Sequence, residues 1–372
     1  MNPQGGAAPY DATFLRVSKK RNHVARYPRK CSREEILIYR STLKGNRGEK
    51  KEMEIALGVV VFLVGLFFLI VSSDWLIQSS VKLSVLFRLT PLFIGLVVVA
   101  FGTSAPEAGV GIIAAIKNQE AIALGNIVGS NIANVGLILG LCALVFPLRV
   151  DRSIFRRELP IMIFASILLY VLSLDSSISR LDGAVFIVCF VIFLFLSYKG
   201  AKKSFDAGEI EHFKFNKICQ KINSRLMIFT LTALSLCGVV LGAHLMVKGG
   251  VTLAKNFGIS SWIIGITVFA VGTSLPELVA SLAASFKKVP SISVGNIVGS
   301  NIFNILFVLG IVSIIRPIIL PPSALKFELP AMLFFSFILF TVMRTKYKIT
   351  RWEGLGMFLG YLIFIAFLLS RG

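Results

Sequence analysis

The stretch Gly102–Glu107 reads GTSAPE, and it returns 170 residues later as GTSLPE at Gly272–Glu277. A second pair of segments keeps the same offset: GNIVGSNIAN at Gly125–Asn134 and GNIVGSNIFN at Gly295–Asn304. Residues 102–140 and 272–310 are identical at 19 of 39 positions without a gap. This agreement indicates an internal duplication, and the organisation of the chain is predicted from it.

The composition is that of a polytopic membrane protein. Of the 372 residues, 55% are hydrophobic and 16% are charged, and the apolar residues gather in long runs. Runs of about 18 or more apolar residues predict membrane-spanning helices. The net charge of +20 does not indicate nucleic-acid binding, because Lys and Arg collect in the cytoplasmic loops of membrane proteins. The five cysteines show no disulfide or metal-ligand spacing.

Ten membrane-spanning helices are expected, so the predicted fold class is an all-α polytopic membrane protein. The first and sixth spans are expected to continue as tilted, partly polar helices to about Leu89 and Phe257. The predicted spans are 54–73, 92–116, 122–146, 158–174, 181–198, 226–247, 262–286, 292–315, 325–343 and 353–370.

The spans form two groups of five, 53–198 and 225–372, separated by a charged loop at 199–224. Because five is odd, the second group enters the membrane from the side opposite to the first. The groups are then related by a pseudo-two-fold axis in the membrane plane, which is the architecture of many secondary transporters. The sequence thus predicts two inverted five-helix repeats.

The distribution of Lys and Arg predicts the orientation. Loops on one side hold 18 of them and loops on the other side hold 6, so the first side is expected to be cytoplasmic. Both termini would be extracytoplasmic, in the plasma membrane (the inner membrane of a bacterium). Residues 1–52 conflict with this rule, since a segment of net charge +8 would have to cross the membrane. We expect a basic, disordered extension there, and one hypothesis is that it precedes a working protein that starts at Met53.

Two acidic residues, Glu107 and Glu277, lie deep inside apolar spans at matching positions. An ionisable group at the centre of a membrane helix costs at least about 2.5–3.5 kcal/mol, which makes it a functional candidate. The alternative is a structural carboxylate bonded to a neighbouring helix, which explains a single Glu better than a matched pair. In an inverted repeat the two side chains are expected to meet near the middle of the membrane.

The residues around each Glu offer oxygen atoms. Pro106 and Pro276 lack the N–H that would bond a carbonyl four residues earlier. Carbonyls near Ala100 and Ala270 are therefore expected to turn inward, which is tolerable at this depth only next to an ion, water or protein. Hydroxyl groups one turn from each Glu come from Thr103, Ser104, Thr273 and Ser274.

The GNIVGSN segments are expected to form the opposite wall of the site. Their glycines stand four residues apart, a spacing that lets helices approach closely, and packing is expected to be their main role. One helical turn separates Ser130 from Asn134 and Ser300 from Asn304, so each pair shares a helix face.

The candidate site contains only oxygen donors. Such donors suit Ca²⁺ or Na⁺ and argue against zinc or copper. Asn126 and Asn296 are either further ligands or hydrogen-bonding partners between helices, and the second role is favoured. Two carboxylates would balance one Ca²⁺, or two of three Na⁺. No catalytic triad, Cys–His pair or phosphate-binding loop is visible, so neither an enzyme nor a bound cofactor is expected.

The paired motifs resemble the two alpha-repeats of the calcium/cation antiporter superfamily, in its bacterial and archaeal sodium/calcium exchanger branch. The resemblance covers about residues 54–372. It implies alternating access, in which the first and sixth helices, here 54–89 and 226–257, slide across a fixed bundle that holds the ions. It also implies metal ligands at Thr103, Ser104, Glu107, Ser130, Asn134, Thr273, Ser274, Glu277, Ser300 and Asn304, with backbone carbonyls from Ala100 and Ala270.

One position departs from the pattern of this branch. Its members often carry Asp where this chain has Asn304, so the site is one carboxylate short, and sodium stoichiometry and coupling are left open. Proton-coupled relatives typically have Gly-Asn-Ala-x-Glu in place of GNIVGSN, so the sequence favours sodium coupling.

The expected function is exchange of Ca²⁺ for Na⁺ by a monomeric secondary antiporter that expels Ca²⁺. One alternative is exchange of Ca²⁺ or another divalent cation against H⁺. Another is a cation channel, although channels usually build their filters from several subunits. The expected partners are the ions and the lipid bilayer, without nucleic acid. His244 matches Asp74 near span ends, where a gating role is an alternative to a purely interfacial one.

Overall fold

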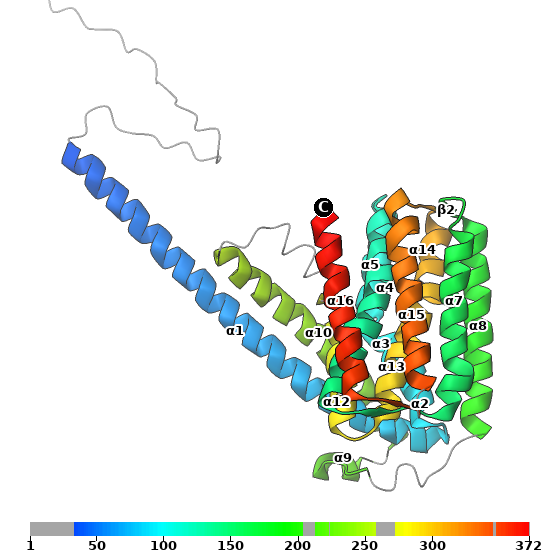
Figure 1. The fold of residues 1–372 in the computed structure, drawn as a ribbon. Coiled ribbons are helices and arrows are strands. Elements are labelled where there is room, and N and C mark those ends of the chain that lie inside the picture. Colours follow the sequence, from blue (N-terminus) through cyan, green and yellow to red (C-terminus); the bar gives the residue numbers. More distant parts are fainter. Residues whose placement is uncertain (1–32, 204–212, 223, 258–271, 345–346, 372) are drawn as a thin grey trace, which may run out of the picture. The chain divides into compact units, whose positions relative to one another are not determined.

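The computed structural model describes residues 33–203, 213–222, 224–257, 272–344 and 347–371 (Figure 1). The chain separates into two units, Met1–Met53 and Glu54–Gly372. Helix α1 (Arg33–Phe87) begins within the first unit and continues into the second. It therefore starts upstream of the first predicted span, inside the basic segment.

Helices make up almost all of the second unit, and several are joined end to end through a π-helical turn, labelled η. The first half contains α2 (Pro91–Phe93), η1 (Ile94–Val99), α3 (Ala100–Thr103), α4 (Ala105–Ile116), α5 (Glu120–Ala133), η2 (Asn134–Leu139), α6 (Gly140–Val145), η3 (Ile154–Glu158), α7 (Leu159–Leu172) and α8 (Arg180–Lys203). The second half contains α9 (Lys217–Lys221), α10 (Arg225–Asn256), α12 (Leu275–Phe286), α13 (Pro290–Ile302), η5 (Phe303–Leu309), α14 (Gly310–Ile315), η6 (Ala324–Glu328), α15 (Leu329–Arg344) and α16 (Arg351–Arg371).

Seven of the described helices are long and apolar enough to cross a membrane, or eight if the bent pair Pro91–Thr103 and Ala105–Ile116 forms one span. The protein is therefore a mostly helical, polytopic membrane protein. The number is smaller than the ten that the sequence predicts. Helix α7 covers most of the predicted span 158–174 but has only 14 residues and follows the basic turn η3. The predicted span 262–286 is seen only as α12, since residues 258–271 lie outside the described ranges.

Two short antiparallel pairs join the halves of the chain. Strand β1 (Leu148–Arg149) pairs with β4 (Lys348–Ile349), with Leu148 opposite Ile349. Strand β2 (Ser177–Ile178) pairs with β3 (Ile318–Ile319), with Ile178 opposite Ile318. Since α7 lies between β1 and β2 in the chain, the two pairs connect the halves at opposite ends of that helix. These strands are not predicted from the sequence.

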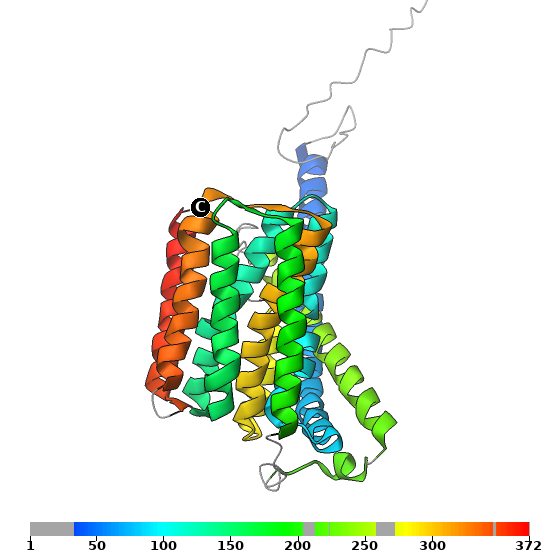
Figure 2. The same ribbon diagram turned by 90° about the vertical axis from the view of Figure 1, so that its right-hand side faces the viewer.

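Two composite helices form the buried centre of the second unit: Glu120–Val145 (α5, η2 and α6) and Pro290–Ile315 (α13, η5 and α14). In their most apolar windows 78% and 83% of residues are buried, against 17% for α1 and for α16. Helices α7, α15 and α16 run side by side around them (Figure 2). Both composite helices contain a GNIVGSN segment, so the repeated motif lies in the protein interior.

Helices α1 and α10 pack against each other through glycines. A Cβ atom at Gly65 would lie 2.3 Å from the backbone nitrogen of Met246, and one at Gly249 would lie 2.5 Å from that of Phe62. Larger residues at these positions would push the helices apart. As predicted, each helix continues beyond its most apolar stretch, α1 to Phe87 and α10 to Asn256.

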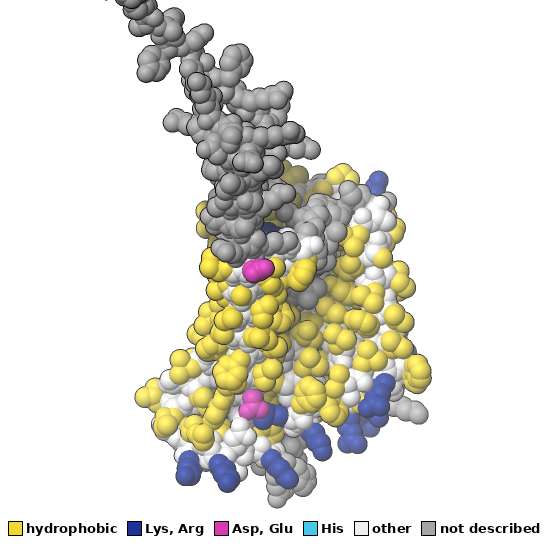
Figure 3. All heavy atoms as spheres, turned by 90° about the vertical axis from the view of Figure 1, so that its left-hand side faces the viewer, with side chains coloured by type: hydrophobic (Ala, Val, Ile, Leu, Met, Phe, Trp, Pro, Cys, Tyr) yellow, Lys and Arg dark blue, Asp and Glu magenta, His cyan; other side chains and the backbone are white. Residues whose placement is uncertain are grey.

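The face shown in Figure 3 carries mostly apolar side chains, and Lys and Arg gather along its lower edge, at the end where α9 lies. Large apolar side chains of α1 are exposed, among them Leu63 (55%) and Phe67 (64%). An apolar surface of this extent suits contact with lipid chains.

Candidate functional site

The first GTS-x-PE segment interrupts its helix, as its proline predicts, and a helix starts at the matching position of the second segment. Helix α3 ends at Thr103, Ser104 leaves the helical conformation with ψ of 7°, and α4 starts at Ala105 after a bend of 45°. In the second copy α12 starts at Leu275, directly after Ser274 with ψ of 5°. Each break leaves a Glu in the first turn of a new helix, where the helix dipole favours a carboxylate.

These two carboxyl groups, Glu107 and Glu277, are fully buried, with 0% of each residue exposed. Each accepts hydrogen bonds from two serine hydroxyls, one from each half of the chain. The four bonds run from Ser130 to Glu107 (3.4 Å), from Ser274 to Glu107 (3.5 Å), from Ser104 to Glu277 (2.8 Å) and from Ser300 to Glu277 (3.5 Å). The predicted acids and serines therefore form two matched groups, each made of residues from both halves, and with the neighbouring threonines and asparagines they are called the cluster below.

Four oxygen atoms of the cluster are buried without a hydrogen-bond donor among the described residues: Glu107 Oε2, Glu277 Oε2, Asn134 Oδ1 and Asn304 Oδ1. No Lys or Arg of the described ranges forms an ion pair with either Glu. A buried charge without a partner destabilises a protein by several kcal/mol. The arrangement therefore has the chemistry of a cation site with hard oxygen ligands.

The two threonines bond to amides of the opposite half. Thr103 Oγ1 donates to Asn296 Oδ1 at 3.2 Å, and Thr273 Oγ1 donates to Asn126 Oδ1 at 3.3 Å. The hydroxyls of Thr273 and Ser130 also lie 3.4 Å apart. Asn126 and Asn296 thus act as interhelical hydrogen-bonding partners, which is the favoured prediction for them.

Two further asparagines, Asn131 and Asn301, belong to the cluster, although the sequence analysis assigns them no role. Asn134 Nδ2 donates to Asn301 Oδ1 at 2.9 Å, and Asn304 Nδ2 donates to Asn131 Oδ1 at 3.2 Å. The signal that could have pointed to them is that the repeat keeps both asparagines at matching positions.

Of the two backbone carbonyls predicted as ligands, the structure describes that of Ala100. The carbonyl of Ala100 accepts bonds from the N–H of Ser104 (2.9 Å) and the hydroxyl of Thr103 (3.4 Å), so it stays within its own helix instead of turning inward. The reason is that α3 keeps its helical bonding up to Ser104, and the interruption follows that residue. Ala270 lies outside the described residues.

The glycines of the second GNIVGSN segment have the predicted packing role. A Cβ atom at Gly299 would lie 2.2 Å from the carbonyl oxygen of Leu96, and one at Gly295 would lie 2.8 Å from that of Leu92. For Gly125 and Gly129 no described residue comes within 4 Å of such an atom, so the structure gives no packing contact for the first copy.

Comparison with known proteins relates these features to a family. A family model described as "Sodium/calcium exchanger protein" matches residues 57–199 and 227–370. Sodium/calcium exchanger MaX1 of Methanosarcina acetivorans is 34% identical over 347 residues, which cover 84% of this chain and 99% of that protein. Inner membrane protein YrbG of Escherichia coli is 34% identical, over 84% of this chain and 97% of that protein. A solved structure of the sodium-calcium exchanger NCX_Mj aligns with a TM-score of 0.73 and 32% identity, over 84% of this chain and 99% of that one.

Proposed function

Since the chain belongs to the sodium/calcium exchanger family, we propose that it is a secondary antiporter that exchanges Ca²⁺ for Na⁺ and expels Ca²⁺ from the cell. The observation that carries this proposal is the buried pair Glu107 and Glu277, each with one carboxylate oxygen for which the described part of the chain supplies no donor. Two negative charges without a basic partner would balance one Ca²⁺ or two Na⁺. The two ions would therefore compete for one set of oxygens.

The proposed ion ligands are the oxygen atoms that surround this pair. Support is strongest for the two glutamates and for the amide oxygens of Asn134 and Asn304, which are buried and receive no hydrogen bond from any residue that the structure describes. The hydroxyls of the cluster would turn their lone pairs to the ion once it is bound. The proposed set is Thr103, Ser104, Glu107, Ser130, Asn134, Thr273, Ser274, Glu277, Ser300 and Asn304.

We propose ten membrane helices in two inverted repeats, with both termini extracytoplasmic. The hydrogen bonds that cross between the halves in matched pairs support this arrangement. The basic lower edge in Figure 3 supports a cytoplasmic position for α9 and the central loop. The relative YrbG is named an inner membrane protein, and the same location is proposed here.

The proposed transport cycle is alternating access, with a monomer as the working unit. Helices α1 and α10 are suited to move as a pair, because they pack closely on each other and only 17% and 33% of their apolar windows are buried. The composite helices of the centre, which carry Ser130, Ser300 and the asparagines of the site, would stay fixed. Movement of the pair would open the site to one side of the membrane at a time.

Flux measurements with the purified full-length chain in liposomes test this function. We expect uptake of radioactive Ca²⁺ into vesicles loaded with Na⁺ and diluted into Na⁺-free buffer, and no uptake when K⁺ replaces Na⁺ on both sides. Vesicles with a pH gradient alone separate sodium coupling from proton coupling, and Ca²⁺ uptake under that gradient would overturn the sodium assignment. A sustained current that does not depend on a counter-ion would identify a channel. Protein-free vesicles are the control.

A further inference from the structure

We propose that Met332 and Met162 set the orientation of the two amides at the ion site, acting through Asn131 and Asn301 as positioning residues. This inference rests on the proposed function, because it concerns how the site holds its cation. All four residues are buried: Met162 is 0% exposed, Met332 1%, and each asparagine 2%.

Two chains of contacts connect the thioethers to the ion site. Asn131 Nδ2 lies 3.8 Å from Met332 Sδ, while Asn131 Oδ1 accepts from Asn304 Nδ2 at 3.2 Å. The other chain runs from Met162 Sδ to Asn301 Nδ2 (3.6 Å) and from Asn301 Oδ1 to Asn134 Nδ2 (2.9 Å). Each chain crosses between the halves, since the asparagine of one half holds the amide of the other.

The orientation of the amide groups in each chain of contacts follows from the chemistry of sulfur. A thioether has no hydrogen to donate and can only accept, so the NH₂ end of Asn131 must face Met332. Its Oδ1 then faces Asn304 and selects the NH₂ end of that side chain. As a result Asn304 Oδ1 points away from Asn131, and it is one of the oxygens without a donor. The same reasoning applied to Met162 and Asn301 fixes Asn134 Oδ1, which is likewise without a donor.

The two chains differ in one contact. Asn301 Nδ2 also donates to the backbone carbonyl of Asn131 at 3.4 Å, a second group that can only accept. For Asn131 Nδ2, the sulfur of Met332 is the one acceptor found among the described residues. Loss of the Met332 sulfur should therefore free the amide of Asn131 to rotate more fully than loss of the Met162 sulfur frees the amide of Asn301.

This arrangement suits an amide at position 304 and opposes a carboxylate there. Asp has oxygen at both ends, so one of them would face Asn131 Oδ1, and the two acceptors would repel. Asn131 could turn its NH₂ group to Asp only by giving up the contact with Met332. The chain from Met332 thus helps to determine that this site carries two carboxylates and not three.

The test compares methionine-to-leucine variants, which keep the apolar volume and remove the acceptor. We expect Met332→Leu to raise the KM for Ca²⁺ about fivefold and Met162→Leu about twofold, within the range of single hydrogen bonds, with kcat nearly unchanged. Met343→Leu is the matched control, because Met343 is equally buried, lies on the same helix as Met332 and accepts no hydrogen bond in the described part of the chain. It should leave KM at the wild-type value.

A second background separates orientation from packing. In Asn304→Asp either end of the side chain presents an oxygen, so Met332→Leu should no longer raise the KM and is expected to lower it, because Asn131 is free to turn. An equal rise in KM in both backgrounds would overturn the proposal and leave Met332 with a packing role only. Equal effects of all three leucine variants in the wild-type background would overturn it as well.

Cation binding by the detergent-purified protein keeps this test independent of transport. The midpoint of Ca²⁺-induced thermal stabilisation should shift in the same order, Met332→Leu more than Met162→Leu and Met343→Leu not at all. If the wild type shows no Na⁺-driven Ca²⁺ flux but this order holds, the proposed exchange is wrong. The proposal that the two methionines orient the amides is then still supported. If neither Ca²⁺ nor Na⁺ stabilises the wild type, the protein has no cation site at which the amides could be oriented. The inference is then wrong as well.

Discussion

The buried centre and the ends of the two long helices follow the internal repeat to different degrees. At the centre, bonds between hydroxyl, amide and carboxyl groups occur in matched pairs across the halves. In the C-terminal half of α1, Asp74 forms an ion pair with Lys287 at 2.6 Å. The matching positions, 170 residues away, hold His244 and Lys117, which are both exposed. No ion pair joins these two in the described ranges.

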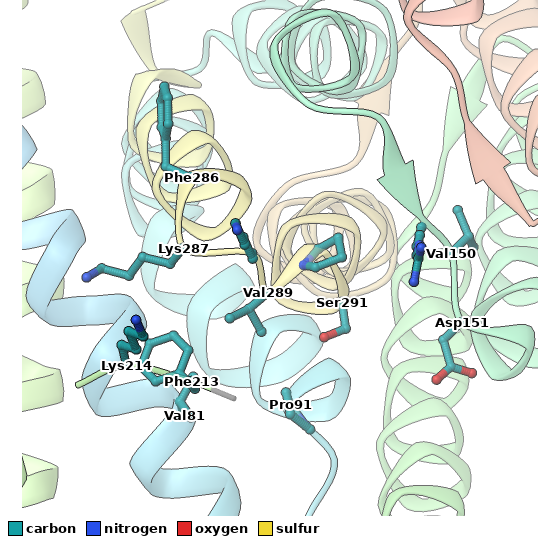
Figure 4. Close-up of a pocket in the computed structure, with 13 residues that line it drawn as sticks. Val81, Pro91, Val150, Asp151, Phe213, Lys214, Phe286, Lys287, Val289 and Ser291 are labelled. Carbon is teal, nitrogen blue, oxygen red and sulfur yellow. The ribbon is translucent and has the colours of Figure 1, made fainter. Parts of the chain in front are cut away.

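Part of the central loop strengthens the contact at α1. Asn216 donates to Asp74 at 3.1 Å through its side chain and to Gln78 at 2.8 Å through its backbone N–H. Lys82 donates to the backbone carbonyl of Ile222. In the close-up of the adjacent cavity of about 600 Å³, Lys287 extends toward α1 from the turn between α12 and α13 (Figure 4).

The buried centre and the contact of Asp74 on α1 differ because they would meet two different requirements. The proposed ion site takes oxygens from each half, which would explain why the repeat is kept there residue by residue. In the proposed cycle, a contact that holds a helix in one arrangement is needed in one helix only, and Asp74 would provide it. If the halves exchange roles during transport, the arrangement seen here is stabilised by contacts that the opposite arrangement lacks.

The largest expected effect tests the equality of the two halves at the centre. Glu107→Gln and Glu277→Gln each remove one of the two negative charges, and we expect either to abolish Na⁺-driven Ca²⁺ uptake while the protein still inserts in the membrane. Membrane expression and size-exclusion profiles of the variants provide the control. Wild-type flux in one variant and none in the other would break the equality, and wild-type flux in both would place the site elsewhere.

A smaller effect tests a difference within the centre. Ser104 donates to Glu277 at 2.8 Å, whereas its counterpart Ser274 donates to Glu107 at 3.5 Å. Hydrogen bonds to charged groups contribute about 1.5–3 kcal/mol, and long ones contribute less. We expect Ser104→Ala to lower kcat/KM for Ca²⁺ about tenfold or more and Ser274→Ala about threefold. Equal losses would indicate that the two serines serve as equivalent ion ligands in the working protein.

The contacts of the centre show what the sequence could predict. The matched burial of Glu107 and Glu277, each bonded to a serine of the other half, follows from two facts visible in the chain, a duplicated motif and a proline beside each Glu. Asn131 is adjacent to a predicted ligand in the same motif, yet its side chain contacts Met332, which lies about 200 positions away. No periodicity or motif specifies that pairing, because it results from the packing of helices α5 and α15.

The fold was predictable where the apolar pattern is strong and less so where it is not. The long helices α1 and α10 follow from their apolar runs, but α1 begins at Arg33, where no apolar run exists. The pairing of β1 with β4 depends on two short segments being brought together by the bundle. The contacts of Asn216 with α1 likewise arise only after the helices have assembled.

Release of the contact at α1 is expected to have a modest effect. The side chains of Asp74 and Lys287 are 37% and 19% exposed, and ion pairs of this kind contribute up to about 1 kcal/mol. We therefore expect Asp74→Asn to shift the balance between the two arrangements by about fivefold at most. The KM for Ca²⁺ should then change in opposite directions when measured on the two sides of oriented vesicles. Lys287→Gln should give a similar shift, and the double variant should add little to either.

The smallest expected effect comes from adding at α10 the carboxylate that α1 already has. In the opposite arrangement of the proposed cycle, position 244 would approach Lys117 as Asp74 approaches Lys287 here, so His244→Asp should stabilise that arrangement and shift the two KM values in the same sense as Asp74→Asn does. The shift should be only about twofold, because a single exposed ion pair is weak and Lys248, not a glutamine, stands where α1 has Gln78. Combined with Asp74→Asn, the substitution should increase the shift further in the same direction. If His244→Asp and Asp74→Asn instead cancel, position 244 acts at the same end of the cycle as Asp74, and the inverted relation between the two helix ends is wrong.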